Sequence, residues 1–414
     1  MENNVKNNVE NNVQKDDKKS KKLLLIIFGM IVVAAVIILL LLGLGDKKGD
    51  GEKVSATPKV EKVAVDTRSM LMKSGETKQL TASKEDAKFT SSNPEVATVD
   101  ATGKVTAVKK GNALITITLG ESKAYCGVIV DGMGTMVDIT KQKAKVIFSD
   151  ILLEEPSAIT SLAVDIMENA YYIAQPYGTA SYETLPSDVI VSKVAKNEEG
   201  AWATTDWMRF YESGTGTIAI DKDGVDTYLL LESNGTYYGS GNTLSSVKWE
   251  NEGFEQEEYG TIYNFSEVSG SASPAIDSWN DMIVLYDDVK KSYLFYDRES
   301  LQSGEDAVYL HEAVCANGQQ PVAGVDESQG FYNATIRDFA VADGYIYQIC
   351  GSSSIYVSVF DLNGTLQYCY RVPDYAEDME VRMPGGIACE AGKVYIAVGS
   401  LNSSYYLGNV WMFE

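Results

Sequence analysis

The chain has 414 residues, with 58 acidic and 35 basic side chains and a formal net charge of −23. This length suffices for two or three domains, each with its own core. The charge argues against a nucleic-acid partner, because phosphate backbones are bound by lysine and arginine side chains that replace their counterions. An acidic surface instead favours solubility or the attraction of cationic ligands.

Cysteine and histidine are too few and too scattered for a metal site. The cysteine count of five is odd, so at least one thiol has no partner within the chain, and no two cysteines form a C-x-x-C pair. The single histidine, His311, lies next to leucine and glutamate, and we interpret it as structural. We therefore predict no metal, no cofactor and buried, unpaired cysteines. The cysteines are Cys126, Cys315, Cys350, Cys369 and Cys389.

An apolar segment near the start of the chain predicts a membrane anchor. Residues 23–44 carry no charge, and as a helix they would span roughly 33 Å. Four lysines lie between residues 18 and 22, which places the N-terminal side in the cytoplasm. We predict a disordered cytoplasmic tail over 1–22, a transmembrane helix over 23–44 and a linker over 45–60. The predicted location is the cell membrane, with a single pass and extracellular C-terminal domains.

The segment 61–131 has the pattern of a small β-sandwich. Short alternating strands are separated by turn pairs such as Asn93-Pro94, Thr102-Gly103 and Lys110-Gly111. The run SSNPEVATVDATGKVTAVKKGNALITI, over Ser91–Ile117, resembles the bacterial immunoglobulin-like group 2 domain. This resemblance implies a stalk or adhesive module of cell-surface proteins. We favour the stalk over direct ligand binding.

A repeated unit predicts a five-bladed β-propeller over 138–414. In each repeat an apolar strand meets a turn of Gly, Asp or Asn, and a second strand follows. If Tyr172, Tyr228, Ile283, Tyr347 and Tyr395 are equivalent, the intervals are 56, 55, 64 and 48 residues. Such spacing fits four-stranded blades, and closing the ring removes exposed sheet edges. The repeats are residues 158–175, 216–233, 272–288, 336–352 and 384–400.

The same part of the chain resembles the helveticin J family. The relatives of that family include propeller domains of phage receptor-binding proteins. The resemblance is carried by the repeated AYYIAQ, GYIYQICG and KVYIAVG segments, over about residues 155–414. The Gly-His-Gly turn of the family appears here as Gly214-Thr215-Gly216, without the histidine. The resemblance implies recognition of cell-wall glycopolymers or envelope components.

Aromatic side chains in loop-like segments are the candidate ligand contacts. Sugar rings stack on such side chains, although the same aromatics could instead pack between blades, and both interpretations stay open. No nucleophile and base pair is evident, so we predict no catalytic residues. The candidate ligand-binding residues are Tyr237, Tyr238, Trp249, Trp279, Tyr332, Tyr405 and Tyr406.

The sequence therefore predicts an all-β protein with an N-terminal transmembrane helix, an immunoglobulin-like β-sandwich and a five-bladed β-propeller. The leading functional hypothesis is a membrane-anchored cell-surface binding protein that recognises cell-wall or other extracellular glycans. The alternatives are an extracellular glycan-cleaving propeller enzyme acting through a carboxylate pair, and a bacteriocin-like protein. The predicted partners are a glycan and the membrane, and nucleic acid is excluded.

Overall fold

The computed structural model is built almost entirely of β-strands, as predicted. It describes residues 62–414 except 155–156, 178–187, 211–212, 224–225, 234–241, 250–254, 257–260, 269–273, 288, 316–335, 352–354, 373–381 and 403–404. Within this part, helix is limited to two 3-10 turns, η1 (Ile139–Lys141) and η2 (Arg298–Ser300). The all-β class follows from the alternating apolar pattern of the strands.

The predicted membrane location must be corrected. In the part of the chain that the structure describes, no helix has the length and apolar character needed to cross a membrane. The reason is that the described residues pair as strands and form only three-residue helical turns. The predicted tail, transmembrane helix and linker, residues 1–60, lie outside the described residues. Membrane anchoring therefore has no part in the function proposed below.

The first seven strands form a two-sheet sandwich. One sheet has the order β1-β7-β6-β3 and the other β2-β5-β4. Burial alternates along β6, so Ala113, Ile115 and Ile117 face the core between the sheets. The strands are β1 (Ser69–Met72), β2 (Thr77–Gln79), β3 (Lys88–Ser91), β4 (Ala97–Val99), β5 (Lys104–Ala107), β6 (Gly111–Leu119) and β7 (Ser122–Val130).

The predicted turn at Thr102-Gly103 depends on glycine. Gly103 has a φ of 84°, a backbone conformation that residues with a Cβ rarely adopt. A Cβ at this position would also lie 2.2 Å from the carbonyl oxygen of Leu80. The turn joins β4 to β5, and at Gly103 its backbone lies directly against the backbone of Leu80.

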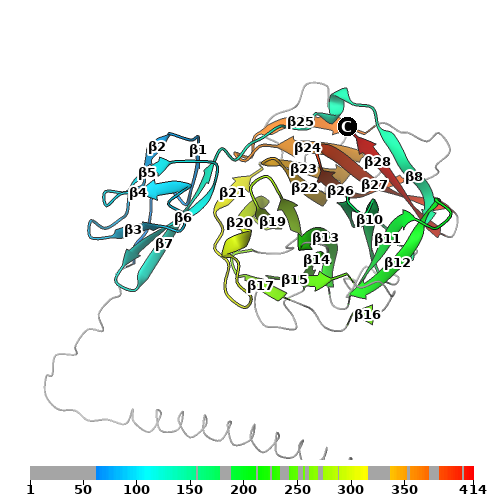
Figure 1. Cartoon of the computed structure of the whole chain (residues 1–414), viewed down its shortest axis with the longest axis horizontal. Coiled ribbons are helices and arrows are strands. Elements are labelled where there is room, and N and C mark those ends of the chain that lie inside the picture. Colours follow the sequence, from blue (N-terminus) through cyan, green and yellow to red (C-terminus); the bar gives the residue numbers. More distant parts are fainter. Residues whose placement is uncertain are drawn as a thin grey trace, which may run out of the picture. The chain divides into compact units, whose positions relative to one another are not determined.

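The remaining strands form five sheets, which we call blades 1 to 5, arranged around a common centre (Figure 1). This is a β-propeller-like ring. Blade 1 contains β9 (Ser161–Asp165), β10 (Ala170–Pro176), β11 (Val189–Lys196), β12 (Trp202–Phe210) and β16 (Glu255–Gln256). Blade 2 contains β13 (Ser213–Asp223), β14 (Asp226–Ser233), β15 (Asn242–Lys248) and β17 (Thr261–Phe265).

Blades 3 to 5 continue the ring. Blade 3 contains β18 (Pro274–Asp277), β19 (Met282–Asp287), β20 (Ser292–Asp297) and β21 (His311–Val314). Blade 4 contains β22 (Ile336–Ala342), β23 (Tyr345–Gly351), β24 (Ile355–Phe360) and β25 (Leu366–Arg371). Blade 5 contains β26 (Arg382–Glu390), β27 (Lys393–Asn402), β28 (Tyr405–Phe413) and β8 (Lys145–Leu152).

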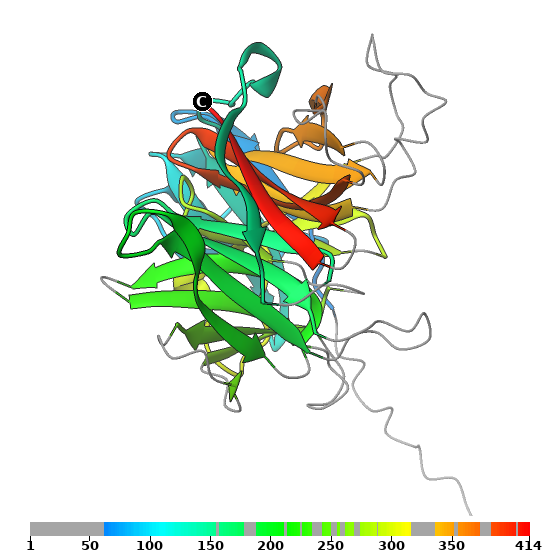
Figure 2. The ribbon, with the colours of Figure 1, turned by 90° about the vertical axis from the view of Figure 1, so that its right-hand side faces the viewer.

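The ring is closed by the earliest strand of this region. β8 pairs antiparallel with β28, so the last blade is completed by a strand that precedes all the others (Figure 2). The first strands of the blades, β9, β13, β18, β22 and β26, each contact the next around the ring, and β26 contacts β9. These five innermost strands enclose the central channel.

The predicted repeats correspond to the inner hairpins of the blades. Each repeat contains the innermost strand and its antiparallel partner. An alanine recurs in each innermost strand, and its partners in the second strands are Tyr172, Leu230, Val284, Tyr347 and Tyr395. The predicted equivalence is thus correct in three blades. It is displaced by two residues in blade 2, at Tyr228, and by one in blade 3, at Ile283.

A buried carboxyl group joins four of the innermost strands. Asp338 of β22 is 2% exposed, and it accepts hydrogen bonds from Ser161 Oγ at 3.0 Å, Leu162 N at 3.2 Å and Ile387 N at 3.0 Å. Ser161 Oγ in turn accepts from Ile218 N of β13 at 3.2 Å. Burial raises the pKa of Asp338 to about 8, against the opposing effect of these hydrogen bonds.

We expect Asp338→Asn to lower the free energy of unfolding by about 2–3 kcal/mol, because its amide NH2 would face backbone N–H groups. Since the folded-state pKa is raised, the stability from Asp338 is full below pH 4 and is lost as pH rises toward 8. Urea unfolding between pH 4 and pH 8 measures both effects. An Asp338→Asn variant with the pH slope of the wild type would contradict this assignment.

The sandwich packs directly against the ring. Ile129 of β7 is buried in one cluster with Leu310 and Leu362 of the ring. The Asn280 amide donates to Gly132 O at 2.8 Å. His311, the single histidine, lies at this junction, with Nδ1 2.9 Å from Ser69 Oγ and Nε2 2.6 Å from Leu362 O. Burial lowers its pKa, so the neutral ring donates from Nε2 to the carbonyl and accepts from the serine.

Gly127 of β7 lies against the backbone of Leu310 at this junction. A Cβ there would lie 1.8 Å from Leu310 O. We expect Gly127→Ala to cost about 1–3 kcal/mol of unfolding free energy and to speed amide hydrogen exchange at the junction. Gly120→Ala is the control, because a Cβ there meets nothing within 4 Å and adds only the strain of a φ of 58°. Equal stability of the two variants would show that this contact does not hold the junction.

Candidate functional site

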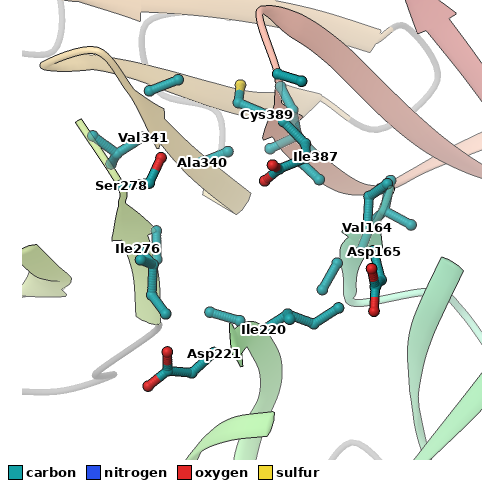
Figure 3. A pocket seen from close by; sticks show the side chains of 18 of the residues that line it. Val164, Asp165, Ile220, Asp221, Ile276, Ser278, Ala340, Val341, Ile387 and Cys389 are labelled. Carbon is teal, nitrogen blue, oxygen red and sulfur yellow. The ribbon is translucent and has the colours of Figure 1, made fainter. Parts of the chain in front are cut away.

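The channel holds a cavity of 430 Å³ that is lined by all five innermost strands (Figure 3). The strands meet there because each blade contributes the same short pattern, an alanine between two larger residues. The small side chain leaves space at the axis where five strands converge. The alanines are Ala163, Ala219, Ala275, Ala340 and Ala388. Larger aliphatic residues, including Val164, Ile220 and Ile276, complete an apolar wall.

Carboxylates follow the alanines at the ends of the innermost strands. In four blades an acidic residue stands two positions after the alanine: Asp165, Asp221, Asp277 and Glu390. In blade 4 that position is Ala342, and Asp343 comes one residue later. Asp165, Asp221, Asp343 and Glu390 line the cavity. One end of the channel is therefore acidic, whereas Asp338 and Ser161 lie at the opposite ends of their strands.

Most of these carboxylates also have structural partners. Asp165 Oδ1 accepts from Met167 N at 2.9 Å and Glu168 N at 3.1 Å, which holds the turn after β9. Asp277 Oδ2 accepts from Gly344 N at 3.0 Å, and Asp343 Oδ2 accepts from Thr135 N at 3.0 Å. These bonds fix where the carboxylates lie.

Asp221 forms an ion pair with Arg298, the basic side chain that lines the cavity. Arg298 also lies 3.4 Å from Asp281, measured from Nη1 to Oδ1. A guanidinium provides several hydrogen-bond donors beside the carboxylate acceptors. The acidic end of the channel can therefore both donate and accept hydrogen bonds.

The pKa of the Glu390 carboxyl is raised above its ordinary value. Burial is the main cause, and the negative charge of Asp165 in the adjacent blade adds to it. Cys389 also lines the cavity, but burial raises the pKa of its thiol well above the ordinary value, so it is no thiolate nucleophile. Among the described residues, no group of three or more metal-ligating side chains is positioned to hold a metal ion.

Of the aromatic residues predicted as ligand contacts, the two whose side chains the structure describes, Trp249 and Trp279, do not line this cavity. Trp249 is buried, packs 4.9 Å from Tyr172 and donates from Nε1 to Asp206 at 3.2 Å. Trp279 is 38% exposed, and Lys110 Nζ lies 3.0 Å from the centre of its ring. Tyr405 and Tyr406 belong to the start of β28. Tyr237, Tyr238 and Tyr332 lie outside the described residues.

Sequence reasoning missed the strand-end carboxylates. The signal was present as LAVD, IAID, PAID and IACE, four copies of an alanine followed two residues later by an acid. It was overlooked because the repeats were aligned on the second strands, where tyrosine is prominent. Alignment on the alanines would have identified the channel lining.

We expect Asp165→Asn to lower the pKa of Glu390, because it removes the neighbouring negative charge and keeps Oδ1 as the acceptor for the turn. A ¹³C NMR titration of the glutamate side-chain carboxyls measures this pKa. Glu198→Gln, at an exposed turn, is the control and should leave the titration unchanged. An unaltered Glu390 pKa in Asp165→Asn would mean that the two carboxylates do not interact.

Comparison with known proteins supports the two-part architecture. Residues 59–128 match the family model of the bacterial Ig-like domain (group 2). The tail fiber of Staphylococcus aureus phage P68 is similar in structure, with a TM-score of 0.50 and 14% identity. That match covers 67% of this chain and 53% of the tail fiber, about half of its length. Among curated proteins, none matches the sequence of this chain.

Two further solved structures share less of the fold. The GH43_1 enzyme from Xanthomonas citri has a TM-score of 0.38 and 10% identity, covering 64% of this chain and 89% of the enzyme. The exo-beta-1,3-galactanase from Phanerochaete chrysosporium has a TM-score of 0.37 and 9% identity, covering 65% of this chain and 64% of that one. The chain thus joins a bacterial Ig-like segment to a propeller-like ring, and the resemblance to the helveticin J family stays a prediction.

Proposed function

We propose that this protein binds glycans, and that a saccharide enters the acidic end of the channel. The observation that carries this proposal is the convergence of Asp165, Asp221, Asp343 and Glu390 with Arg298 on a cavity of 430 Å³. This volume is within the range of small-molecule sites. Sugar hydroxyls can donate to the carboxylates and accept from the guanidinium, while the aliphatic wall contacts the C–H groups of the ring.

The charge of the site selects among glycans. Among the described residues, four carboxylates and one guanidinium line the cavity, so it repels polymers rich in phosphate or uronate. Neutral sugars and sugars with ammonium groups fit this balance. The Ig-like sandwich, which packs on the ring through Ile129 and Asn280, is proposed to support the ring rather than to bind the ligand.

The test uses the full chain in native gels that contain a neutral β-glucan, chitosan or polygalacturonate. We expect retardation by the first or second polymer. The double variant Asp165→Asn, Glu390→Gln should bind about tenfold more weakly, since each charged hydrogen-bond partner contributes about 1.5–3 kcal/mol, partly retained by the amides.

The matched control is Glu198→Gln with Glu199→Gln, which removes the same charge at an exposed turn of the ring. It should migrate and bind as the wild type does. If neither the β-glucan nor chitosan retards the wild-type chain, or if the control loses binding equally, the channel is not a glycan site.

Glycan cleavage is a second candidate function, and one observation favours it. Hydrolysis of a glycosidic bond uses a carboxylic acid that stays protonated and a second carboxylate that is ionised. Glu390, whose pKa is raised by burial, and Asp165 of the adjacent blade are two carboxyl groups that line the same cavity. Release of reducing ends from the retarded polymer, abolished by Glu390→Gln, would establish cleavage. If the polymer retards the protein but no reducing ends are released, the channel binds glycans without cleaving them.

A further inference from the structure

A second hollow lies between the outer strands of blades 5 and 1. This groove has a volume of 650 Å³ and is lined by residues 150–154, at the end of β8, and 202–207 of β12. None of these residues belongs to an innermost strand or lines the channel cavity. Thr204 Oγ1 donates to Leu152 O at 2.8 Å and so ties the two walls together.

Two tryptophans share the groove because of a β-bulge. Trp207 lies five positions after Trp202, an odd offset, so in a regular strand their side chains would point to opposite faces. The pairing of β12 with β11 shifts by one residue, since Lys193 pairs with Asp206 while Val194 pairs with Thr204. This irregularity leaves Thr205 unpaired and reverses the alternation. Both tryptophans thereby border the same groove.

Trp202 is held as a rigid platform. Its ring centre lies 5.3 Å from that of Phe148 and 5.5 Å from that of Tyr171, so one part of the ring packs on the core. Trp207 is half-buried, and among the described residues no aromatic ring packs against it. A preorganised aromatic surface loses little conformational freedom when a ligand binds.

The remaining lining combines acidic and hydroxyl-bearing side chains with the aliphatic residues Ile151, Leu152, Leu153 and Ala203. Asp150, Glu154 and Asp206 line the groove with the hydroxyl-bearing Thr204 and Thr205, and no lysine or arginine is among its described lining residues. Aromatic faces beside hydrogen-bond acceptors suit a sugar, whose C–H face is apolar and whose edge carries hydroxyls. The carboxylates would repel anionic polymers.

A peptide strand fits this groove less well. Asp150 has a φ of 57°, and the pairing of β8 with β28 is irregular beside it, between Gly408 and Val410. Such an interruption breaks the straight edge that an added strand needs. The edge of β8 therefore lacks the regular row of backbone N–H and C=O groups to which a peptide strand could pair.

We propose that the groove between β8 and β12 is a second saccharide site, specific for neutral or ammonium-bearing sugars that stack on Trp202 and Trp207. The proposal shares with the proposed function only the class of ligand, because the two sites have no residue in common. A single long glycan could engage both sites, which would raise its overall affinity without new contacts.

Isothermal titration of the full chain tests the proposal with three hexameric probes: N-acetylated chitohexaose, its deacetylated form and oligogalacturonate. We expect two sites per chain for one or both of the first two probes. Trp207→Ala should remove one site or weaken it about 5- to 10-fold, and Trp207→Phe should retain it in part. Tyr125→Ala, which removes a half-buried aromatic ring of the sandwich outside the groove, is the control and should bind as the wild type does.

Each outcome separates the two sites. If Trp207→Ala binds as the wild type does, the groove proposal is wrong, whatever the channel does. If Trp207→Ala loses a site while the Asp165 and Glu390 double variant loses none, the groove stands and the channel proposal fails. If the wild-type chain binds oligogalacturonate and Trp207→Ala does not, the proposed preference of the groove for neutral or ammonium-bearing sugars is wrong. No binding of any probe would overturn the groove proposal, and thermal unfolding verifies that each variant is folded.

Discussion

The antiparallel pairing of β8 with β28 is the constraint on which the rest of the ring depends. Without it, blade 5 would lack its outer strand and the two ends of the ring would be joined only through their inner strands. The five innermost strands lie around one axis, and β26 contacts β9 where the ring closes. The same strand forms one wall of the groove that holds Trp202 and Trp207. Both candidate sites are thus products of ring closure.

The lining of the channel meets two separate structural requirements. Five strands can converge only if small residues occupy the axis, and the recurring alanines meet this need. The turns that follow these strands need hydrogen-bond acceptors for their backbone N–H groups, and Asp165 and Asp277 provide them. The acidic end of the channel therefore has a structural origin. A site for a polar ligand arises where these turn carboxylates also face a cavity.

Sequence reasoning succeeded for local features and failed for residues that meet across the ring. Alternating apolar residues and turn pairs predicted the sandwich and the inner hairpins, because both depend on neighbouring residues. The equivalence of Tyr228 and Ile283 with the other second-strand residues was wrong, since Leu230 and Val284 are the residues that pair with the recurring alanines of blades 2 and 3. The channel carboxylates were missed because tyrosine dominates the pattern of the second strands. The membrane location was wrong because it was inferred from residues 23–44 alone, outside the part of the chain that the structure describes.

By itself, the sequence determined the all-β class, the Ig-like segment and the hairpin at the centre of each blade. These follow from strand periodicity and turn chemistry, which act over a few residues. Only the tertiary structure decided that Asp165 and Glu390 lie in adjacent blades, that Asp338 joins four inner strands and that His311 lies between the sandwich and the ring. It also decided that Trp202 and Trp207 border one groove. These residues meet because distant segments close into a ring and because β12 contains a one-residue bulge. Neither feature produces a periodic pattern in the amino-acid sequence.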